Sequence, residues 1–230
     1  MKNVVIYGDI HGCLEEFEEL RKKIPSNSIE ITVGDFLDKG PYSKETIEYL
    51  RKNRIFSILG NHEYKYLRKK IGRKVKMDEE QEKIYNSLSD NDFEYIFSLP
   101  YFIKANKLTI LHAGISNHIY LSNPSMSELN RLLFFREVDK NERFLPLNHS
   151  CKESTFWADI YDGHEGFVVY GHSAFLEIKK DIFSAGIDTG CVYGNKLSAI
   201  IIENTLRPYE YRVIEVKSKR KYAEPISDLK

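Results

Sequence analysis

The stretch that decides the fold is GDFLDKG at residues 34–40, which directly follows the apolar run IEITV at residues 29–33. A short apolar run bounded by glycine is typical of a buried β-strand. Two carboxylates, Asp35 and Asp38, therefore stand where a strand emerges, between two glycines. The carboxyl ends of strands form the binding edge of α/β sheets, so this stretch indicates both a strand–loop–helix unit and a site.

The first sixty residues repeat this unit. Strands are expected at residues 4–7, 29–33 and 55–59, and helices at residues 13–24 and 43–53. In the first helix the acids lie in the first turn and the bases in the last, as the helix dipole favours. Alternation of strands and helices at this spacing predicts an α/β fold in which helices cross over between parallel strands.

The rest of the chain is expected to add a helical insertion and a second group of strands. Residues from about 64 to 99 are polar, follow a helical pattern and end before Pro100, whereas residues 117–160 show no clear pattern. Further strands are expected at residues 108–111, 167–170, 182–187, 197–202 and 209–216. No helical period separates the last three, so we expect them to be antiparallel. We expect a single α/β domain at residues 1–216, with mixed sheets flanked by helices in a sandwich, and a loose polar tail at 217–230.

Composition narrows the class of protein. The 34 basic and 34 acidic residues balance, so net charge gives no support for nucleic-acid binding. No apolar run reaches the roughly 18 residues of a membrane span, and the start of the chain does not read as a signal peptide. The three cysteines form no CxxC pair, which favours reduced thiols. A cytoplasmic globular protein is therefore expected.

Five of the expected strands are followed by glycine and by side chains that bind metals. These side chains are Asp9 and His11 after the first strand, then Asp35, Asn61, His112 and His172. A single aspartate after a strand is often only a helix cap, and a single histidine there is often only hydrogen-bonded in the core. Six such residues at five strand ends instead favour one common site, because the strand ends converge.

The composition of this set points to a dinuclear metal centre. Two aspartates, one asparagine and three histidines, without a thiolate, suit Mn, Fe or Zn rather than calcium or a structural zinc. Six ligands exceed what one catalytic ion with an open position needs. They suit two ions about 3.5–4 Å apart that share a bridging carboxylate. We therefore expect a hydrolase with two divalent cations, most readily Mn²⁺, with Fe or Zn as the other options.

Five motifs in this order resemble those of the calcineurin-like metallophosphoesterases. They are GDIHG (8–12), GDFLDKG (34–40), GNHE (60–63), HAG (112–114) and GH (171–172). Within that family the chain is similar to the phosphoprotein phosphatase branch, which includes Ser/Thr protein phosphatases, bacteriophage protein phosphatases and bacterial diadenosine tetraphosphatases. The segment GIDTGCVYGNKLSAI (186–200) is similar to the closing strand pair of that branch.

The resemblance implies a role for each matching residue. Asp9 and His11 would bind the first metal, Asp35 would bridge, and Asn61, His112 and His172 would complete the second. A hydroxide held between the ions would attack phosphorus in line, without a phosphoenzyme. His62 matches the general acid that protonates the leaving oxygen, and Asp38 matches the carboxylate that orients this histidine.

Lys39 departs from the family pattern, which has an arginine here that grips the substrate phosphate. Lysine keeps the charge but loses the planar two-pronged donor, so weaker or less selective phosphate binding is expected; alternatively, Lys39 points to solvent. A second arginine is also expected, and nucleotide-processing relatives carry it just before a tryptophan that resembles Trp157. It is missing at that position here. Arg136 is the substitute candidate, or else an ordinary arginine on a helix surface.

The leading functional hypothesis is a phosphomonoesterase similar to Ser/Thr protein phosphatases. The first alternative is a dinucleoside polyphosphate hydrolase, such as a diadenosine tetraphosphatase, which cuts an anhydride; the basic run at 65–76 and the segment 157–172 favour it. A nucleic-acid-end phosphatase is a further alternative without support from net charge. A non-catalytic scaffold is disfavoured because it would not need His62. The expected partner is thus a phosphorylated protein or a nucleotide.

Overall fold

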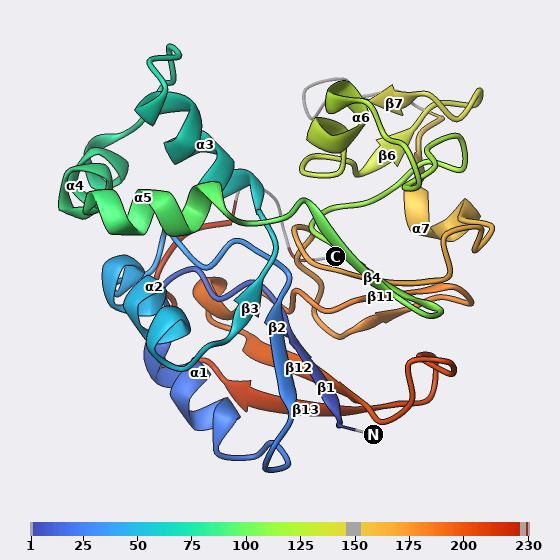
Figure 1. Ribbon diagram of the computed structural model, residues 1–230, viewed down its shortest axis with the longest axis horizontal. Helices are drawn as coiled ribbons and strands as arrows, with labels where there is room; N and C mark the ends of the chain where they lie inside the picture. Colours follow the sequence, from blue (N-terminus) through green and yellow to red (C-terminus); the bar gives the residue numbers. More distant parts are fainter. Residues whose placement is uncertain (1, 146–152, 226–228, 230) are drawn as a thin grey trace.

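The computed structural model describes residues 2–145, 153–225 and 229, and it consists of two packed sheets with helices outside them (Figure 1). The first sheet contains β1 (Val4–Tyr7), β2 (Ile29–Thr32), β3 (Phe56–Ser57), β12 (Lys196–Ile202) and β13 (Tyr211–Lys217). Its order is β13-β12-β1-β2-β3. Strands β1, β2 and β3 are parallel, whereas β12 and β13 are antiparallel to their neighbours. Helices α1 (Leu14–Arg21) and α2 (Ser43–Lys52) connect the parallel strands, which confirms the predicted crossover units.

Strand β3 is shorter than the five residues that the sequence predicts. The backbone N–H of Ile55 donates to Leu50 O at 3.0 Å, and that of Leu59 donates to Pro100 O at 2.8 Å. These two peptide groups bond outside the sheet, so only Phe56 and Ser57 pair with β2.

The second sheet contains β4 (Phe102–Ala105), β5 (Leu108–Leu111), β9 (Phe167–Tyr170), β10 (Lys179–Lys180) and β11 (Ser184–Gly186), in the order β10-β11-β9-β5-β4. Here one prediction is wrong. The strand expected at 182–187 does not join the last two strands as an antiparallel group; it becomes β11, which runs parallel to β9. The chain then changes sheets through a loop that contains the 3₁₀ turn η1 (Cys191–Tyr193). The other two strands, β12 and β13, are antiparallel as predicted.

Alternation along the strands builds the core. Ile6 of β1 and Val169 of β9 belong to a buried cluster between the two sheets, whereas Tyr7 packs with Phe17 of α1 on the outer side of the first sheet. On the outer side of the second sheet, Tyr170 packs with the aromatic rings of Phe156 and Trp157. Successive strand residues thus point to opposite faces, and both sheets are covered on both faces.

The predicted helical insertion consists of three helices rather than one continuous pattern. They are α3 (Asn61–Lys70), α4 (Glu79–Ser87) and α5 (Asp90–Phe97). The hydroxyl of Ser89 accepts a hydrogen bond from the backbone N–H of Asp92 at 3.3 Å, which starts α5 and separates it from α4. Figure 1 shows these helices on the side of α2, away from α7.

The segment without a clear sequence pattern forms short elements. They are α6 (Met126–Arg131), β6 (Glu137–Val138), β7 (Phe144–Leu145), β8 (Thr155–Phe156) and α7 (Trp157–Ile160), with the three strands in a small sheet of order β7-β6-β8. They cover the outer face of the second sheet. None of the helices in the described ranges has the length and apolar character that a membrane span requires.

The segment that follows β13 packs against α1. The backbone N–H of Lys219 donates to Glu16 at 2.9 Å, and the Tyr222 hydroxyl donates to the same carboxylate at 2.8 Å. The expectation of a loose tail is therefore wrong for residues 218–225, while residues 226–228 and 230 lie outside the described residues. That residues 1–216 form one domain stays a prediction.

Candidate active site

The side chains predicted as metal ligands gather where the strand ends of both sheets meet. Oδ2 of Asp35 lies 3.7 Å from Nε2 of His11 and 3.4 Å from Nε2 of His112. Oδ1 of Asn61 lies 2.9 Å from Nε2 of His112 and 2.7 Å from Nδ1 of His172. Four loops and the start of α3 thus bring their polar side chains into one cluster, as the strand-end pattern predicts.

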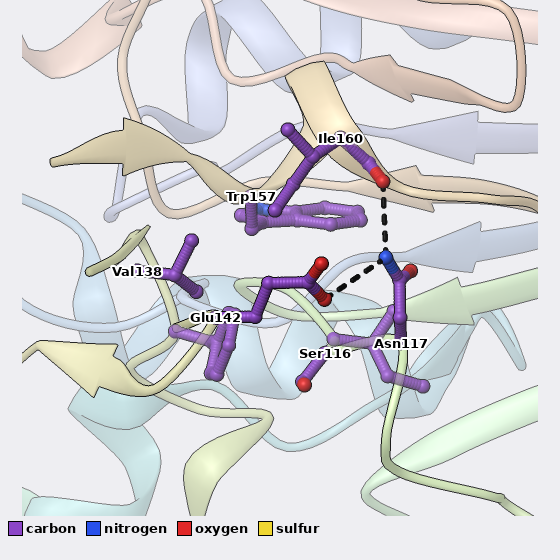
Figure 2. A pocket seen from close by; sticks show the side chains of 8 residues that line it. Ser116, Asn117, Val138, Glu142, Trp157 and Ile160 are labelled. Carbon is purple, nitrogen blue, oxygen red and sulfur yellow. Dashed lines mark hydrogen bonds between the residues drawn. The ribbon is translucent and has the colours of Figure 1, made fainter. Parts of the chain in front are cut away.

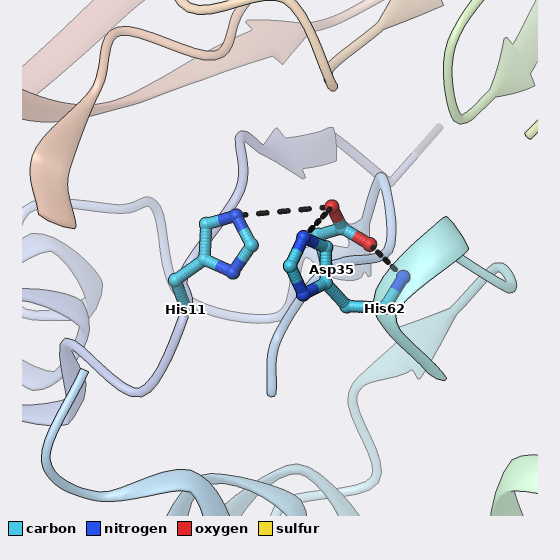
Figure 3. A group of neighbouring side chains, drawn as sticks. All are labelled: His11, Asp35 and His62. Carbon is cyan, nitrogen blue, oxygen red and sulfur yellow. Dashed lines mark hydrogen bonds and ion pairs between the residues drawn. The ribbon is translucent and has the colours of Figure 1, made fainter. Parts of the chain in front are cut away.

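Asp35 stands at the centre of this cluster. Two groups of side chains, His11–Asp35–His62 and Asp35–His112–His172, each have their possible ligating atoms within 4.8 Å of one another. Figure 3 shows the Asp35 carboxylate beside the two imidazoles of the first group, with Oδ2 facing both rings and Oδ1 facing the backbone N–H of His62. Only Asp35 belongs to both groups, which is the arrangement that a bridging carboxylate requires.

Asp9 belongs to neither group, but its carboxylate contacts the backbone of His172. Its two oxygens accept hydrogen bonds from the backbone N–H of His172 at 3.2 and 3.0 Å. Burial, followed by the nearby carboxylates of Asp188 and Asp35, raises the pKa of Asp9 well above its usual range. Three buried carboxylates at close range repel one another, and a divalent cation would relieve this repulsion.

Backbone carbonyls fix the orientation of two histidine rings. Nδ1 of His11 lies 2.9 Å from Leu37 O, and Nδ1 of His112 lies 2.8 Å from Val33 O. Each ring donates its Nδ1 proton to a carbonyl and turns Nε2 toward the site. Burial, with the charges of Lys39 and His62, lowers the pKa of His11, so its ring is neutral as a metal ligand must be.

His172 provides a further sign of a metal site. Its Nε2 atom is buried and has no hydrogen-bond partner among the described residues. Burial and the charge of Arg136 hold the pKa of His172 well below its usual range. A neutral ring with an unpaired buried nitrogen, beside crowded carboxylates, fits the pair of divalent cations that the ligand set predicts.

The loops of the site hold unusual backbone conformations. Five of the nine non-glycine residues with positive φ in the described part of the chain belong to these loops: His11, Asp35, Asp38, Lys39 and His172, with φ between 46° and 77°. Such conformations cost about 1–3 kcal/mol each and persist where the surrounding structure imposes them. Their concentration here shows that the loop geometry of the site is held at a cost in local stability.

Gly60 and Glu63 hold the loop that carries Asp35. A Cβ added to Gly60 would lie 2.3 Å from the backbone N of Asp35, so only glycine permits this approach. The buried carboxylate of Glu63 accepts hydrogen bonds from the backbone N–H groups of Asp35 (2.8 Å), Leu37 (3.0 Å) and Gly60 (3.1 Å). Burial and the charge of Asp35 raise the pKa of Glu63 to about 8. No role for Glu63 was predicted from the sequence, although this residue is the last one of the GNHE motif.

His62 and Asp38 form a close pair. Nδ1 of His62 lies 2.6 Å from Oδ2 of Asp38, which also accepts hydrogen bonds from Nζ of Lys65 at 3.2 Å and Nε2 of Gln81 at 3.0 Å. Burial alone would raise the pKa of Asp38, but the hydrogen bond and charge of His62, with the charge of Lys65, hold it below its usual range. Lys65 and Gln81 were not predicted, and no motif or spacing in the sequence connects Gln81 of α4 with the site.

Lys39 points into the site, so the alternative that it points to solvent is wrong. Its Nζ lies 3.0 Å from Nε2 of His11 and donates to the Tyr193 hydroxyl at 2.8 Å. Burial by itself lowers the pKa of Lys39, but the neighbouring Tyr193 and Asp35 raise it above its usual value. The lysine therefore brings a positive charge to the edge of the cluster. Tyr193 is a second neighbour that the sequence did not reveal.

Arg136 also lies beside the cluster. It is not on a helix surface, because it precedes β6, and its Nη2 donates to His172 O at 2.9 Å. Its Nε is buried and makes no hydrogen bond within the described residues. The structure thus places a second cation next to the predicted ligands, where a phosphate oxygen could meet it.

Trp157 is a packing residue. The indole is buried, and Nε1 donates to Ala113 O at 3.1 Å. It forms one wall of a small pocket, in which Asn117 donates to Ile160 O at 3.0 Å and to Glu142 at 3.4 Å (Figure 2). Trp157 therefore supports the loop after β5 from behind rather than facing the cluster.

Comparison with known proteins shows that most of the chain matches one family. The family described as calcineurin-like phosphoesterase matches residues 2–205. A bis(5'-nucleosyl)-tetraphosphatase PrpE (asymmetrical) of Oceanobacillus iheyensis is 32% identical over 84% of this chain and 86% of its own. The protein of the same name from Anoxybacillus flavithermus is 28% identical over 94% of this chain and 95% of its own.

Solved structures show the same fold. A crystal structure of a candidate diadenosine tetraphosphatase superposes with a TM-score of 0.76 and 25% identity, over 94% of both chains. A protein serine/threonine phosphatase from Saccharomyces cerevisiae superposes with a TM-score of 0.59 and 18% identity, over 94% of this chain and 80% of that one. The chain therefore belongs to the calcineurin-like phosphoesterase family, and it is a metal-dependent hydrolase of phosphate esters or phosphoanhydrides.

Proposed function

We propose that the protein hydrolyses dinucleoside tetraphosphates. The observation that carries this proposal is the complete cluster around Asp35, with the His62–Asp38 pair, in a chain whose full-length relatives are named bis(5'-nucleosyl)-tetraphosphatases. The sequence alone favoured a Ser/Thr protein phosphatase. The likeness to such a phosphatase is 18% identity and concerns the fold, so the relatives favour the nucleotide substrate.

The proposed metal centre uses the predicted ligands. His11 and Asp9 would serve one cation, Asn61, His112 and His172 the other, and Asp35 both. Bound divalent cations, for which Mn²⁺ is our choice, would supply Lewis acidity toward phosphoryl oxygens and make water a nucleophile at neutral pH. With both histidines bound as neutral rings, the second group would hold its cation with a single carboxylate. A ligand set with so little negative charge would leave the cation able to bind an anionic substrate as well.

The remaining residues would bind and protonate the substrate. Lys39 and Arg136 would donate to the phosphate oxygens, because both bring a cation to the cluster. His62 uses Nδ1 for Asp38, so Nε2 is the ring atom that would give a proton to the leaving phosphate oxygen. Asp38 would keep the ring in that tautomer and orientation.

The basic run at residues 65–76 begins within α3 and continues beyond the last residue of that helix, Lys70. Lys69 and Lys70 contact Glu82 and Asp90, so part of the basic run is balanced by acids of the insertion. Four bases of the same run remain solvent-exposed: Arg68, Arg73, Lys74 and Lys76. At a rise of about 1.5 Å per residue, Arg68 lies roughly 10 Å along the helix from Asn61. A chain of four phosphates carries enough charge and length to profit from such a surface, whereas a single phosphate does not.

The test is steady-state hydrolysis with Mn²⁺ of three substrates at matched concentrations: diadenosine tetraphosphate, a phosphoserine peptide and a 5'-phosphorylated oligonucleotide. We expect kcat/KM for the dinucleotide to exceed the others by more than about a hundredfold, a transition-state preference of roughly 2.7 kcal/mol. A comparable advantage for the peptide would overturn the proposal in favour of a protein phosphatase, and near-equal values would indicate a broad phosphomonoesterase.

A further inference from the structure

A second cluster of metal-binding side chains lies outside the proposed active site. Cys13 and Glu16 come from the start of α1, and Cys191 comes from η1, far along the sequence. All three are at most 1% exposed, and their possible ligating atoms lie within 4.8 Å of one another. Both cysteines are free thiols. None of the three belongs to the ligand set around Asp35, and the proposed reaction uses none of them.

The carboxylate of Glu16 shows the feature that points to a bound ligand. One carboxylate oxygen, Oε1, accepts hydrogen bonds from the backbone N–H of Lys219 at 2.9 Å and from the Tyr222 hydroxyl at 2.8 Å. The other oxygen, Oε2, is buried and accepts none from the described residues. A buried carboxylate oxygen without a partner costs about 1–3 kcal/mol or more, and a bound cation would remove that cost.

The geometry and chemistry of the cluster suit a thiophilic cation. Cys13 precedes the first residue of α1 and Glu16 follows three positions later, so both lie on the same side of the first helical turn. Thiolates select zinc over magnesium, calcium or manganese. Two thiolates and one carboxylate around Zn²⁺ leave a net charge of −1, the same as in the common sites with three cysteines and one histidine.

We propose that Cys13, Glu16 and Cys191 bind one zinc ion. The two thiols would release their protons to solvent when the ion binds. The ion would join α1, η1 and, through Glu16, the segment after β13. Because Cys13 follows His11 by two residues and Cys191 follows Asp188 by three, it would also fix two loops of the active site from behind.

Cobalt provides a test that the active site cannot mimic. The full chain, stripped of metal and kept reduced with a phosphine, is titrated with Co²⁺ while the near-ultraviolet sulfur-to-cobalt charge-transfer band is recorded. The ligands around Asp35 contain no sulfur, so only a cysteine site can give this band. We expect one equivalent of Co²⁺ to produce the band, and Zn²⁺ to displace it. A wild-type protein that binds cobalt without any sulfur band overturns the proposal.

Matched variants identify the cysteines that give rise to the charge-transfer band. Cys13→Ala and Cys191→Ala are expected to abolish it, whereas Cys151→Ala, outside the described residues, is expected to keep it. Glu16→Gln keeps both sulfurs and is expected to lower the affinity for this cobalt ion by at least about 10–100-fold, the loss that removal of a partner outside the ligand shell already causes. If the alanine variants do not fold, the cobalt affinity of Glu16→Gln tests the proposal by itself. An unchanged affinity in Glu16→Gln, a band that survives Cys191→Ala, or a mass two hydrogens lower from a Cys13–Cys191 disulfide in the purified protein would each contradict the site.

Discussion

Nδ1 of His62 lies 2.6 Å from Oδ2 of Asp38, and the same carboxylate oxygen accepts hydrogen bonds from Lys65 and Gln81. This contact uses one nitrogen of the imidazole and leaves Nε2 for the substrate. It also joins the GDFLDKG loop to the start of α3 and to α4. The proposed general acid is therefore held by three segments of the chain, and its removal should affect proton transfer more than metal binding.

His62→Asn tests that role through the leaving group. A general acid contributes about 10²–10⁴-fold when the leaving oxygen needs a proton. We expect a loss of that size for an alkyl phosphate and a much smaller one for nitrophenyl phosphate, whose leaving group hardly needs protonation. The measurement is kcat for both substrates at saturating Mn²⁺. Equal losses on the two substrates would show that His62 is not the acid.

Asp38→Asn should act through His62 rather than independently. The amide can no longer hold the imidazole in its tautomer with the same strength, so we expect kcat to fall by at least about tenfold, with the same dependence on the leaving group. In the double variant with His62→Asn, the additional loss from Asp38→Asn should nearly vanish, because residues that act as a unit are not additive. Additive losses in this cycle would contradict the pairing.

Lys39→Met should weaken phosphate binding without disturbing the fold. A charged hydrogen bond contributes about 1.5–3 kcal/mol, so kcat/KM should fall by roughly 10–100-fold. The matched control is Lys107→Met, an exposed lysine in the loop between β4 and β5. Lys39→Arg restores the residue that resembling proteins carry and should keep or raise kcat/KM. If Lys39→Met and the control behave alike, Lys39 does not bind the substrate.

Ile200→Ala tests the interface between the two sheets. Ile200 is fully buried in that cluster, so the deletion should lower the free energy of unfolding by about 2–5 kcal/mol. Val213→Ala, at the position that pairs with Ile200 across β12 and β13 but 36% exposed, should cost much less. Denaturant unfolding of the apo forms gives both values. Equal destabilisation would mean that the sheets do not pack through this face.

The clustering of the expected metal ligands could be predicted from the sequence because each one follows a strand within a few residues. The positions of Asp35, Asn61 and His112 depend only on local strand–loop units and on the rule that parallel strand ends converge. Gln81 could not be predicted in this way. It reaches Asp38 from α4, and only the tertiary packing of the insertion brings the two together.

The misjudged elements have the same physical origin. The link from β9 to β11 contains no helix, so the sequence pattern resembled an antiparallel meander although the two strands are parallel. The segment after β13 is polar and suggested a loose tail. It is held instead by contacts of Lys219 and Tyr222 with a buried carboxylate of α1, which no local pattern encodes.

The most direct test of the central claim is the identity of the products from diadenosine tetraphosphate. The wild-type protein and Asp35→Asn are each incubated with the dinucleotide and Mn²⁺, and nucleotides are separated by anion exchange. The relatives are named for asymmetrical cleavage, and if the proposed function holds with the same cleavage, the wild type should give ATP and AMP in equal amounts. The variant should give no product, because Asp35 is the one carboxylate shared by both ligand groups. An intact dinucleotide, alongside rapid release of phosphate from a phosphoserine peptide by the same preparation, would contradict the account.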